Sequence, residues 1–275
     1  MVDYGAVPCG KTIQVGGGRV VVANQIVATG GFVIQTEGYQ VWVDPGPGAL
    51  VRAKQFGVKP QRTDIIYVSH HHIDHSNDLN LLIDAMTIGG VRQKGVLIST
   101  PTVISGSGDE SAVLQNFYKK ALKEIFAVRA GDKVTIGNLN FVATPTSHDV
   151  EFNNGLRLET PKFVLGYTGN TAPKPELAEV FKGCNVLIID VLKPGNEAWK
   201  THFCVDDAAA LIKEVKPELA IITHFGARLL RKRPIYEARD IQQKTGVRTI
   251  AAHDGLRIDM SGTVKQDLTR DATVA

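Results

Sequence analysis

The most chemically informative segment of the chain covers residues 69–75, which contain the pattern His-x-His-x-Asp-His. Imidazole nitrogens and carboxylate oxygens are good ligands for borderline divalent metals such as zinc. In an extended stretch, residues two apart point to the same side, so His70 and His72 can grip one ion together. Asp74 and His75 lie just beyond and are placed to reach a second ion. The alternative is a polar surface turn that is merely rich in histidine.

Two later histidines stand where a sheet would present further ligands. His148 follows a predicted strand over 139–143, and His224 follows one over 219–223. Ligands on loops at strand ends are a common way for a rigid sheet to present a metal site. Each histidine taken alone could be structural, but their joint placement favours metal binding.

The elements that must position these side chains change in character along the chain. The first part contains β-rich runs separated by glycine turns, and the later part alternates strands with helices, which indicates two sheets covered by helices. The predicted strands are 19–22, 31–35, 40–43, 64–68, 96–99, 134–136, 139–143, 163–167, 186–189, 219–223, 247–251 and 256–258. The predicted helices are 78–85, 175–181, 205–215 and 235–244.

The segment over 111–125 carries apolar residues at near-helical spacing and follows a flexible run of serine and glycine. It predicts a helix, either as a lid over a substrate or as a plain connection. With neither an internal repeat nor a clear linker, the chain is expected to form a single domain over 1–275. Residues 1–15 and 261–275 are expected to be tails.

Composition sets broad limits on function. Of the 275 residues, 43% are apolar and 21% are charged, as in an ordinary soluble globular protein. The net charge of +3 is too small to argue by itself for nucleic acid or membranes. Three cysteines are an odd number without close pairing, which favours reduced thiols in a cytoplasmic protein. Neither a signal-peptide pattern nor an apolar run long enough to cross a bilayer is found, so no membrane partner is expected.

These motifs together resemble the metallo-β-lactamase-fold hydrolases, and especially their ribonuclease Z-like phosphodiesterase branch. The resemblance runs from roughly residue 31 to residue 260. The motifs that carry it are the loop 44–48, the cluster 70–75, His148, the turn 169–171, His224 and the Asp-Gly pair 254–255. The resemblance implies an α/β fold, a four-layer αββα sandwich with two metal ions at the edge between the sheets.

The resemblance also divides the ligands into two groups. The first group is His70, His72 and His148, and the second is Asp74, His75 and His224. Asp44 would accept hydrogen bonds that fix the cluster loop, or would merely cap a turn. The expected cofactors are two divalent ions, zinc first, with manganese or iron as alternatives.

One position departs from the family pattern. The family usually carries aspartate in a Gly-Asp-Thr turn, where its carboxylate bridges both metals, and this chain carries Asn170. A neutral amide can ligate one ion but bridges poorly, so the second ion is expected to bind weakly. Three explanations remain open: a natural variant with a lopsided or single-metal site, an engineered substitution that quiets the enzyme, or a different geometry. Asp149 and Asp190 are the carboxylates that could compensate for the missing negative charge at position 170.

The expected activity is hydrolysis by a metal-activated water or hydroxide. Asp74 is the one confident anionic ligand, so the site is positive and favours an anionic substrate, most simply a phosphodiester of nucleotide or RNA type. Asp190 and His202 resemble an acid–histidine dyad in which His202 is the general acid, although a buried pair that supports the fold is the alternative. Arg228 could contact a phosphate, as an arginine at similar spacing does in the ribonuclease Z-like enzymes.

Two other functions remain open. One is hydrolysis of lactones, thioesters or similar acyl compounds at the same site, and the other is a catalytically weakened metal-binding protein, because of Asn170. A ribonuclease Z proper is disfavoured because no long Gly/Pro-rich arm is present, and β-lactam hydrolysis because no export signal is seen. Redox chemistry is also disfavoured, because oxygen-reducing relatives usually carry glutamate where this chain has His72. The expected partner is a small or nucleotide-like anion, with RNA and a homodimer as further options.

Overall fold

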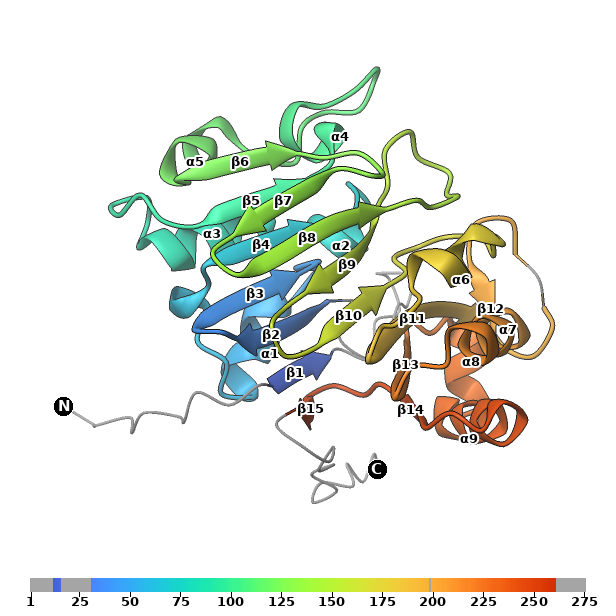
Figure 1. Cartoon of the computed structure of the whole chain (residues 1–275). Coiled ribbons are helices and arrows are strands. Elements are labelled where there is room, and N and C mark those ends of the chain that lie inside the picture. The colour runs from blue at the N-terminus through green and yellow to red at the C-terminus, as the bar shows by residue number, and fades with distance from the viewer. Residues whose placement is uncertain (1–11, 16–30, 198, 261–275) are drawn as a thin grey trace.

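The structure is a computed structural model that describes residues 12–15, 31–197 and 199–260. Over these residues the strands form two mixed sheets (Figure 1). The first sheet has the order β15 (Leu256–Asp259), β1 (Thr12–Val15), β2 (Phe32–Thr36), β3 (Tyr39–Val43), β4 (Ile65–Val68), β5 (Val96–Ser99) and β6 (Glu124–Ala127). The second has the order β14 (Thr249–Ala251), β13 (Leu219–Thr223), β11 (Val186–Lys193), β10 (Val164–Tyr167), β9 (Gly155–Glu159), β8 (Leu139–Thr144) and β7 (Lys133–Ile136), with β12 (Phe203–Cys204) paired to β11.

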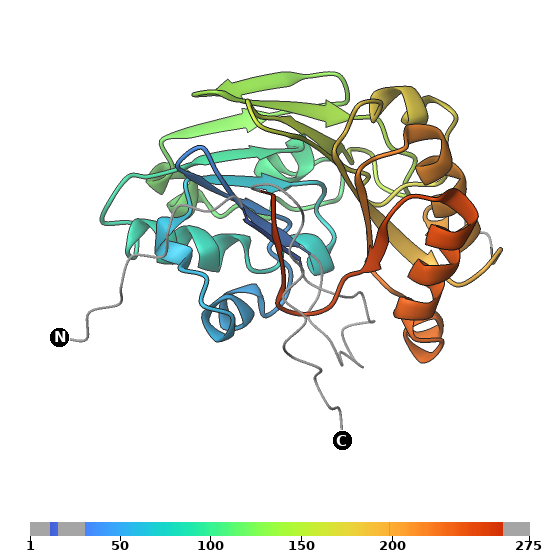
Figure 2. The same ribbon diagram turned by 60° about the horizontal axis from the view of Figure 1, so that its bottom comes forward.

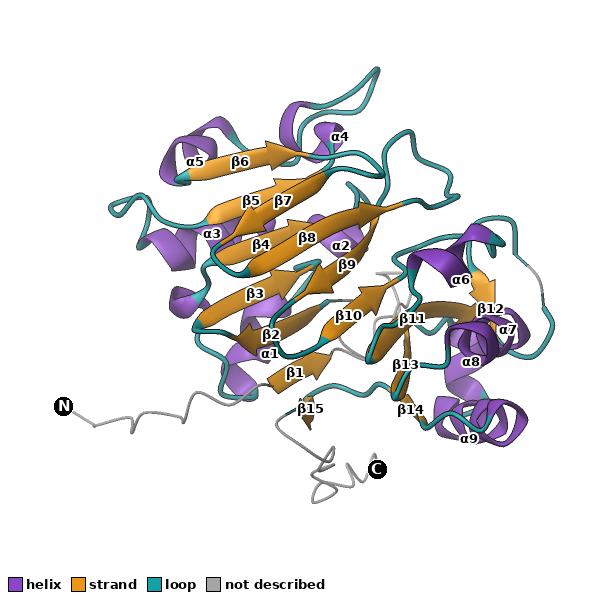
Figure 3. Cartoon of the chain, in the orientation of Figure 1, coloured by secondary structure: helices purple, strands orange, loops and turns teal. Residues whose placement is uncertain are grey.

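Helices cover the outer face of each sheet (Figures 2 and 3). The helices of the first half are α1 (Ala49–Gln55), η2 (Pro60–Arg62), α2 (Ile73–Ser76), α3 (Leu79–Thr87), α4 (Pro101–Ser105) and α5 (Asn116–Ala121). Those of the second half are α6 (Glu176–Val180), α7 (Val205–Val215), α8 (Ala227–Arg231) and α9 (Pro234–Thr245). None of the helices in the described part of the chain has the length and hydrophobicity needed to cross a bilayer.

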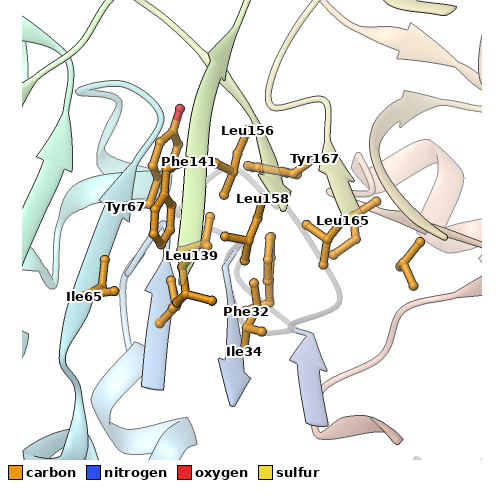
Figure 4. Close-up of a cluster of buried hydrophobic side chains, with 14 of the residues drawn as sticks. Phe32, Ile34, Ile65, Tyr67, Leu139, Phe141, Leu156, Leu158, Leu165 and Tyr167 are labelled. Atoms are coloured by element: carbon orange, nitrogen blue, oxygen red, sulfur yellow. The ribbon is translucent and has the colours of Figure 1, made fainter. Parts of the chain in front are cut away.

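Three buried clusters separate these layers, because the central strands bury both of their faces. Along β4, Ile65 and Tyr67 face the other sheet, whereas Ile66 and Val68 pack with the helices of the first half. Figure 4 shows the cluster between the sheets, where Tyr67 lies beside Phe141. Full burial of one such side chain stabilises the fold by about 1.5–3 kcal/mol. The αββα sandwich expected from the sequence is therefore confirmed.

The site edge follows from strand direction. Strands β3 to β6 run parallel, as do β10, β11 and β13. Strand β8 runs in the direction of β10, because both are antiparallel to β9. In each sheet the carboxyl ends of these strands therefore meet at one edge, and the arrowheads of β3, β8 and β10 point the same way in Figure 1. In such sheets, loops that follow the carboxyl ends are where ligand sites form.

One expectation about the tails is wrong. Residues 12–15 form β1, which pairs antiparallel with both β2 and β15. The sequence around so short a strand says little about its pairing, because one of its two partners lies at the far end of the chain. The rest of both predicted tails, and the predicted strand 19–22, lie outside the described residues. The assignment of 1–275 to a single domain stays a prediction.

The helix expected over 111–125 is also largely wrong. Only Asn116–Ala121 is helical, and Glu124–Ala127 forms the edge strand β6. Periodicity favoured one long helix, but backbone pairing of β6 with β5 extends the first sheet instead. The sequence also gave no signal for β9, α1, α4 or α8, which are short.

Candidate metal centre

Asp44 holds the histidine cluster in place from the end of β3. Its Oδ1 accepts the Ser69 backbone N–H at 2.7 Å, and its Oδ2 accepts the Ser69 hydroxyl at 2.8 Å. The same Oδ2 lies 2.9 Å from Nδ1 of His75. A carboxylate in this position accepts, so Nδ1 of His75 carries the hydrogen and its Nε2 offers a lone pair to the site. Asp44 is fully buried, and these contacts fix the orientation of His75 relative to the start of the cluster loop.

The second ligand group predicted from the sequence assembles across the two sheets. Nε2 of His75 lies 3.1 Å from Nε2 of His224, and Oδ2 of Asp74 lies 3.3 Å from the same His224 nitrogen. One candidate ligand atom from each of the three residues lies within 4.8 Å of the others, and all three residues are buried. His224 has a φ of 62°, a left-handed backbone conformation that its place directly after β13 imposes.

The first ligand group assembles around His70, His72 and His148. Nε2 of His148 lies 3.3 Å from Nδ1 of His72, and Nδ1 of His148 lies 3.3 Å from the Thr201 carbonyl oxygen. Both ring nitrogens of His148 face acceptors, because Nδ1 faces this carbonyl and Nε2 lies 3.0 Å from Oδ1 of Asp149. An ion bound at Nε2 would take the place of the Asp149 contact and leave the hydrogen on Nδ1. The Ser69 hydroxyl donates to Asp44 and therefore accepts from Nδ1 of His70 at 2.9 Å. Nε2 of His70 then carries a lone pair.

A bound cation fits these donors. Nε2 of His70 is buried without a hydrogen-bond partner among the described residues. The converging imidazole nitrogens and carboxylate oxygen would repel one another unless a proton or a metal ion lay between them. The ring centroids of His70 and His75 lie 4.4 Å apart, so the two groups are adjacent. Nitrogen donors with a carboxylate are the set that zinc prefers.

The charge states of the imidazoles differ between the groups. Burial, with help from the nearby His75, holds the pKa of His70 well below its usual value, and burial lowers the pKa of His148 to about 4. Both rings are therefore neutral and ready to ligate at pH 7. Burial alone would lower the pKa of His75 too, but the Asp74 and Asp44 carboxylates raise it to about 9. A metal ion must displace that proton from His75.

Asn170 occupies the turn after β10 and is buried. Its Nδ2 lies 3.1 Å from Nε2 of His75, and its Oδ1 is buried without a hydrogen-bond partner within the described structure. The two ends of an amide exchange by a half-turn of the terminal bond, and that rotation would aim Oδ1 at the second group. The position therefore suits a ligand, but the ligand is neutral.

His202 lies against both ligand groups. Its ring centroid is 5.6 Å from that of His224 in a stacked arrangement and 5.0 Å from that of His148 in an edge-on one. Nδ1 of His202 pairs with the Thr201 hydroxyl at 2.9 Å. Asp190 is buried on β11. The structure thus brings His202 to the site, while the dyad role of the pair stays a prediction.

Tyr167 is a site residue that sequence reasoning missed. Its hydroxyl lies 2.8 Å from Oδ2 of Asp44 and 2.9 Å from Oδ2 of Asp190. Burial, opposed in part by the nearby His224, raises the pKa of Asp190 above its usual value. The only available signal was the position of this tyrosine at the end of a strand, three residues before Asn170.

Two predicted residues lie at the outer part of the site. Arg228, on α8, forms an ion pair with Glu197 at 2.9 Å, and its side chain is 63% exposed. Asp149 places Oδ1 3.0 Å from Nε2 of His148, so it adds negative charge beside the first group. Phosphate contact by Arg228 and charge compensation by Asp149 stay predictions.

Comparison with known proteins identifies the family. The model of the β-lactamase superfamily domain matches residues 39–225, a range that begins at β3 and ends just past His224. An uncharacterised protein of Methanocaldococcus jannaschii is 36% identical over 258 residues, which cover 93% of this chain and 96% of that protein. The chain belongs to the metallo-β-lactamase superfamily. It is a metal-dependent hydrolase of this type, with two histidine-rich candidate metal sites.

More distant superfamily members share most of the fold. Ribonuclease Z of Methanopyrus kandleri is 24% identical over 267 residues, which cover 83% of this chain and 90% of the ribonuclease. The crystal structure of the metallo-β-lactamase fold protein YhfI of Bacillus subtilis superposes with a TM-score of 0.74 at 18% identity, over 90% of this chain and 98% of that one. The fold is therefore common to proteins with quite different sequences.

Replacement of Asp44 tests whether it positions the site. Asp44→Asn keeps the shape but adds an amide N–H next to the Nδ1 hydrogen of His75, so the zinc affinity should fall by roughly 10- to 100-fold. Competition with a chromophoric chelator measures that affinity. Asp64→Asn is the matched control, because Asp64 stands just before the opposite end of β4 and accepts from the Gln40 backbone. Wild-type affinity in a folded Asp44→Asn protein would contradict the role given to Asp44.

Proposed function

We propose that this metallo-β-lactamase protein hydrolyses phosphodiesters of the nucleotide type. The observation that carries the proposal is the charge of the ligand set, which in the described structure contains a single carboxylate, Asp74, among imidazoles. Two divalent ions with one carboxylate have a formal charge of about +3, before any water ionises. Asn170 adds no negative charge. Such a centre favours a substrate that brings its own negative charge.

The relatives support the same class of substrate. A ribonuclease cleaves phosphodiester bonds, and the Methanopyrus ribonuclease Z aligns with most of this chain, including the region of the ligands. At 24% identity the likeness supports the bond type more than the size of the substrate. A small nucleotide-like ester is therefore proposed first, and RNA second. The proposal also includes assembly as a homodimer and action in the cytoplasm.

The proposed roles follow from position. Bound at the two groups, divalent ions would supply an activated water and an electrophilic contact for the phosphoryl oxygens. His202, in ring contact with both groups, would donate a proton to the leaving oxygen. The buried Asp190 carboxyl would favour the protonated form of that ring. Arg228 would hold a phosphate oxygen by exchanging its partner Glu197 for the substrate.

The second candidate function is a metal-binding protein with weak activity. Asn170 favours it, because a neutral amide beside the second group would lower the affinity for at least one ion. The two candidates predict different results for ester hydrolysis and for the replacement of Asn170 by aspartate.

Hydrolysis of a substrate panel tests the leading proposal. The protein loaded with zinc or manganese should turn over bis(p-nitrophenyl) phosphate and leave lactones and thioesters nearly untouched, because the positive centre favours an anion. Release of p-nitrophenolate or of thiol is followed by absorbance. His75→Ala, loaded in the same way, is the control for contaminating activity. Faster turnover of a lactone or thioester than of the phosphodiester would overturn the proposal in favour of an acyl hydrolase.

Asn170→Asp tests the cost of the amide. A carboxylate adds negative charge beside the second group, so the affinity for the more weakly bound ion should rise roughly tenfold or more. Elemental analysis after dialysis against graded chelator reports the ions bound per chain. Asn140→Asp, on the exposed part of β8, makes the same change in net charge away from the site. Equal metal content in both variants would show that Asn170 does not limit metal binding.

His202→Ala tests the general acid. For a phosphodiester with an alkyl leaving group, kcat should fall by about 10²–10⁴, since the alkoxide needs the proton most. For a p-nitrophenyl ester, kcat should fall much less, because p-nitrophenolate leaves without a proton. The metal content of the protein should not change. His253→Ala, at an exposed turn, is the matched control. An equal loss for both leaving groups would remove His202 from proton transfer.

A further inference from the structure

A short turn, residues 199–202, forms part of the wall of the metal centre. Its Thr201 carbonyl oxygen lies 3.3 Å from Nδ1 of His148, a ligand of the first group. Its last residue, His202, places its ring against His148 and His224. The backbone of this turn is therefore fixed relative to both ligand groups.

The first residue of the turn is Trp199, which forms an isolated antiparallel bridge with His202. Residues directly opposite in an antiparallel pair carry their side chains on the same face. Because the His202 ring faces the ligand groups, the indole of Trp199 leaves the turn on that same side. The ring is 52% exposed, and the bridge places the Trp199 backbone beside that of His202, at the border of the centre.

The surroundings of Trp199 suit a planar anionic ligand. Nζ of Lys193 lies 4.5 Å from the centroid of the indole ring, which places a positive charge on one face of the ring. The loop that carries Trp199 also carries Glu197, which holds Arg228 at 2.9 Å. A single loop thus joins the metal centre, an exposed aromatic ring and two cations. An isolated exposed tryptophan needs no explanation, but one that lies beside Lys193 and on the turn that borders the centre does.

We propose that Trp199 is the stacking platform for the base of a nucleotide-type substrate, with Lys193 beside it attracting the phosphate. Bases stack on exposed aromatic rings, and a neighbouring cation strengthens binding of the attached phosphate. The inference rests on the proposed phosphodiesterase function and names its substrate class, a phosphodiester that carries a nucleobase. Trp199 makes contact with the base and takes no part in proton transfer.

Two esters with one leaving group test the stacking role. Thymidine 5′-(p-nitrophenyl phosphate) carries a base, whereas methyl p-nitrophenyl phosphate does not, and both release p-nitrophenolate. Trp199→Ala should raise KM for the thymidine ester by about 5- to 100-fold, with kcat nearly unchanged, and should leave KM for the methyl ester as it was. Trp199→Phe should restore most of the affinity. Tyr236→Ala, which removes an exposed aromatic ring from α9, is the matched control and should change neither value.

Intrinsic fluorescence gives a readout that does not need turnover. The chain has two tryptophans, and Trp42 is only 4% exposed, so a ligand at the border of the centre should quench Trp199 alone. Titration with thymidine 5′-monophosphate should quench the wild-type protein, and Trp199→Phe should abolish the change. Methyl phosphate at equal concentration should not quench. Circular dichroism and metal content confirm that each variant is folded and loaded.

The outcomes separate this inference from the function on which it rests. If the wild-type protein cleaves neither ester, the proposed phosphodiesterase function fails, while the fluorescence titration still decides whether a nucleotide stacks on Trp199. If both esters are cleaved and Trp199→Ala raises KM equally for both, the turn is structural and the stacking role is wrong. Absence of quenching by the nucleotide, in a protein that cleaves the thymidine ester, would overturn it as well.

Discussion

The buried carboxylate of Asp44 is the interaction on which the metal centre depends. It accepts hydrogen bonds from Ser69 and His75 on the first sheet and lies 2.8 Å from the Tyr167 hydroxyl on the second. An ionised carboxylate can accept about four hydrogen bonds at once, whereas an amide or a hydroxyl oxygen accepts about two. One side chain therefore ties the cluster loop to the opposite sheet. The same set of contacts therefore closes the sandwich at this edge and fixes the geometry of the ligands.

Orientation of the ligands depends on atoms that do not face the metal centre. Asp44 fixes the hydrogen of His75, the Ser69 hydroxyl fixes that of His70, and the Thr201 carbonyl fixes that of His148. Each contact places a hydrogen on Nδ1 and turns Nε2 toward the site, where a bound ion would replace the second proton of His75 and the Asp149 contact of His148. Without these contacts the rings could adopt either tautomer and several rotamers, and an ion would have to select among them. The scaffold therefore fixes the orientation of the rings before any ion arrives.

Much of this arrangement could be predicted from the sequence, for identifiable reasons. Strands that bury both faces, such as β4 and β13, are continuous apolar runs, and each ends directly at a predicted ligand loop. Helix α7 has the predicted bounds, because its apolar stripe and its acidic first turn indicate the same start and length. Pairing of β1 with β15, the strand at Glu124–Ala127 and the Tyr167 contacts were missed, because each depends on a partner distant in sequence. The ion pair of Arg228 with Glu197 depends on a loop whose course leaves no periodic signal.

The position of negative charge explains how a centre with Asn170 can still hold cations. Asp44 and Asp190 are both buried, and both contact the single hydroxyl of Tyr167, which has one hydrogen to share between them. Their charge lies behind His75 and His224 instead of between the two ligand groups. Attraction falls with distance but is weakly screened in a buried site, so carboxylates behind the ligands still favour bound cations. The face turned toward the substrate, however, lacks a bridging carboxylate and stays more positive. Under the proposed function, the amide would bind the ions less tightly than a carboxylate and, by the same change in charge, would leave the centre more attractive to an anionic ester.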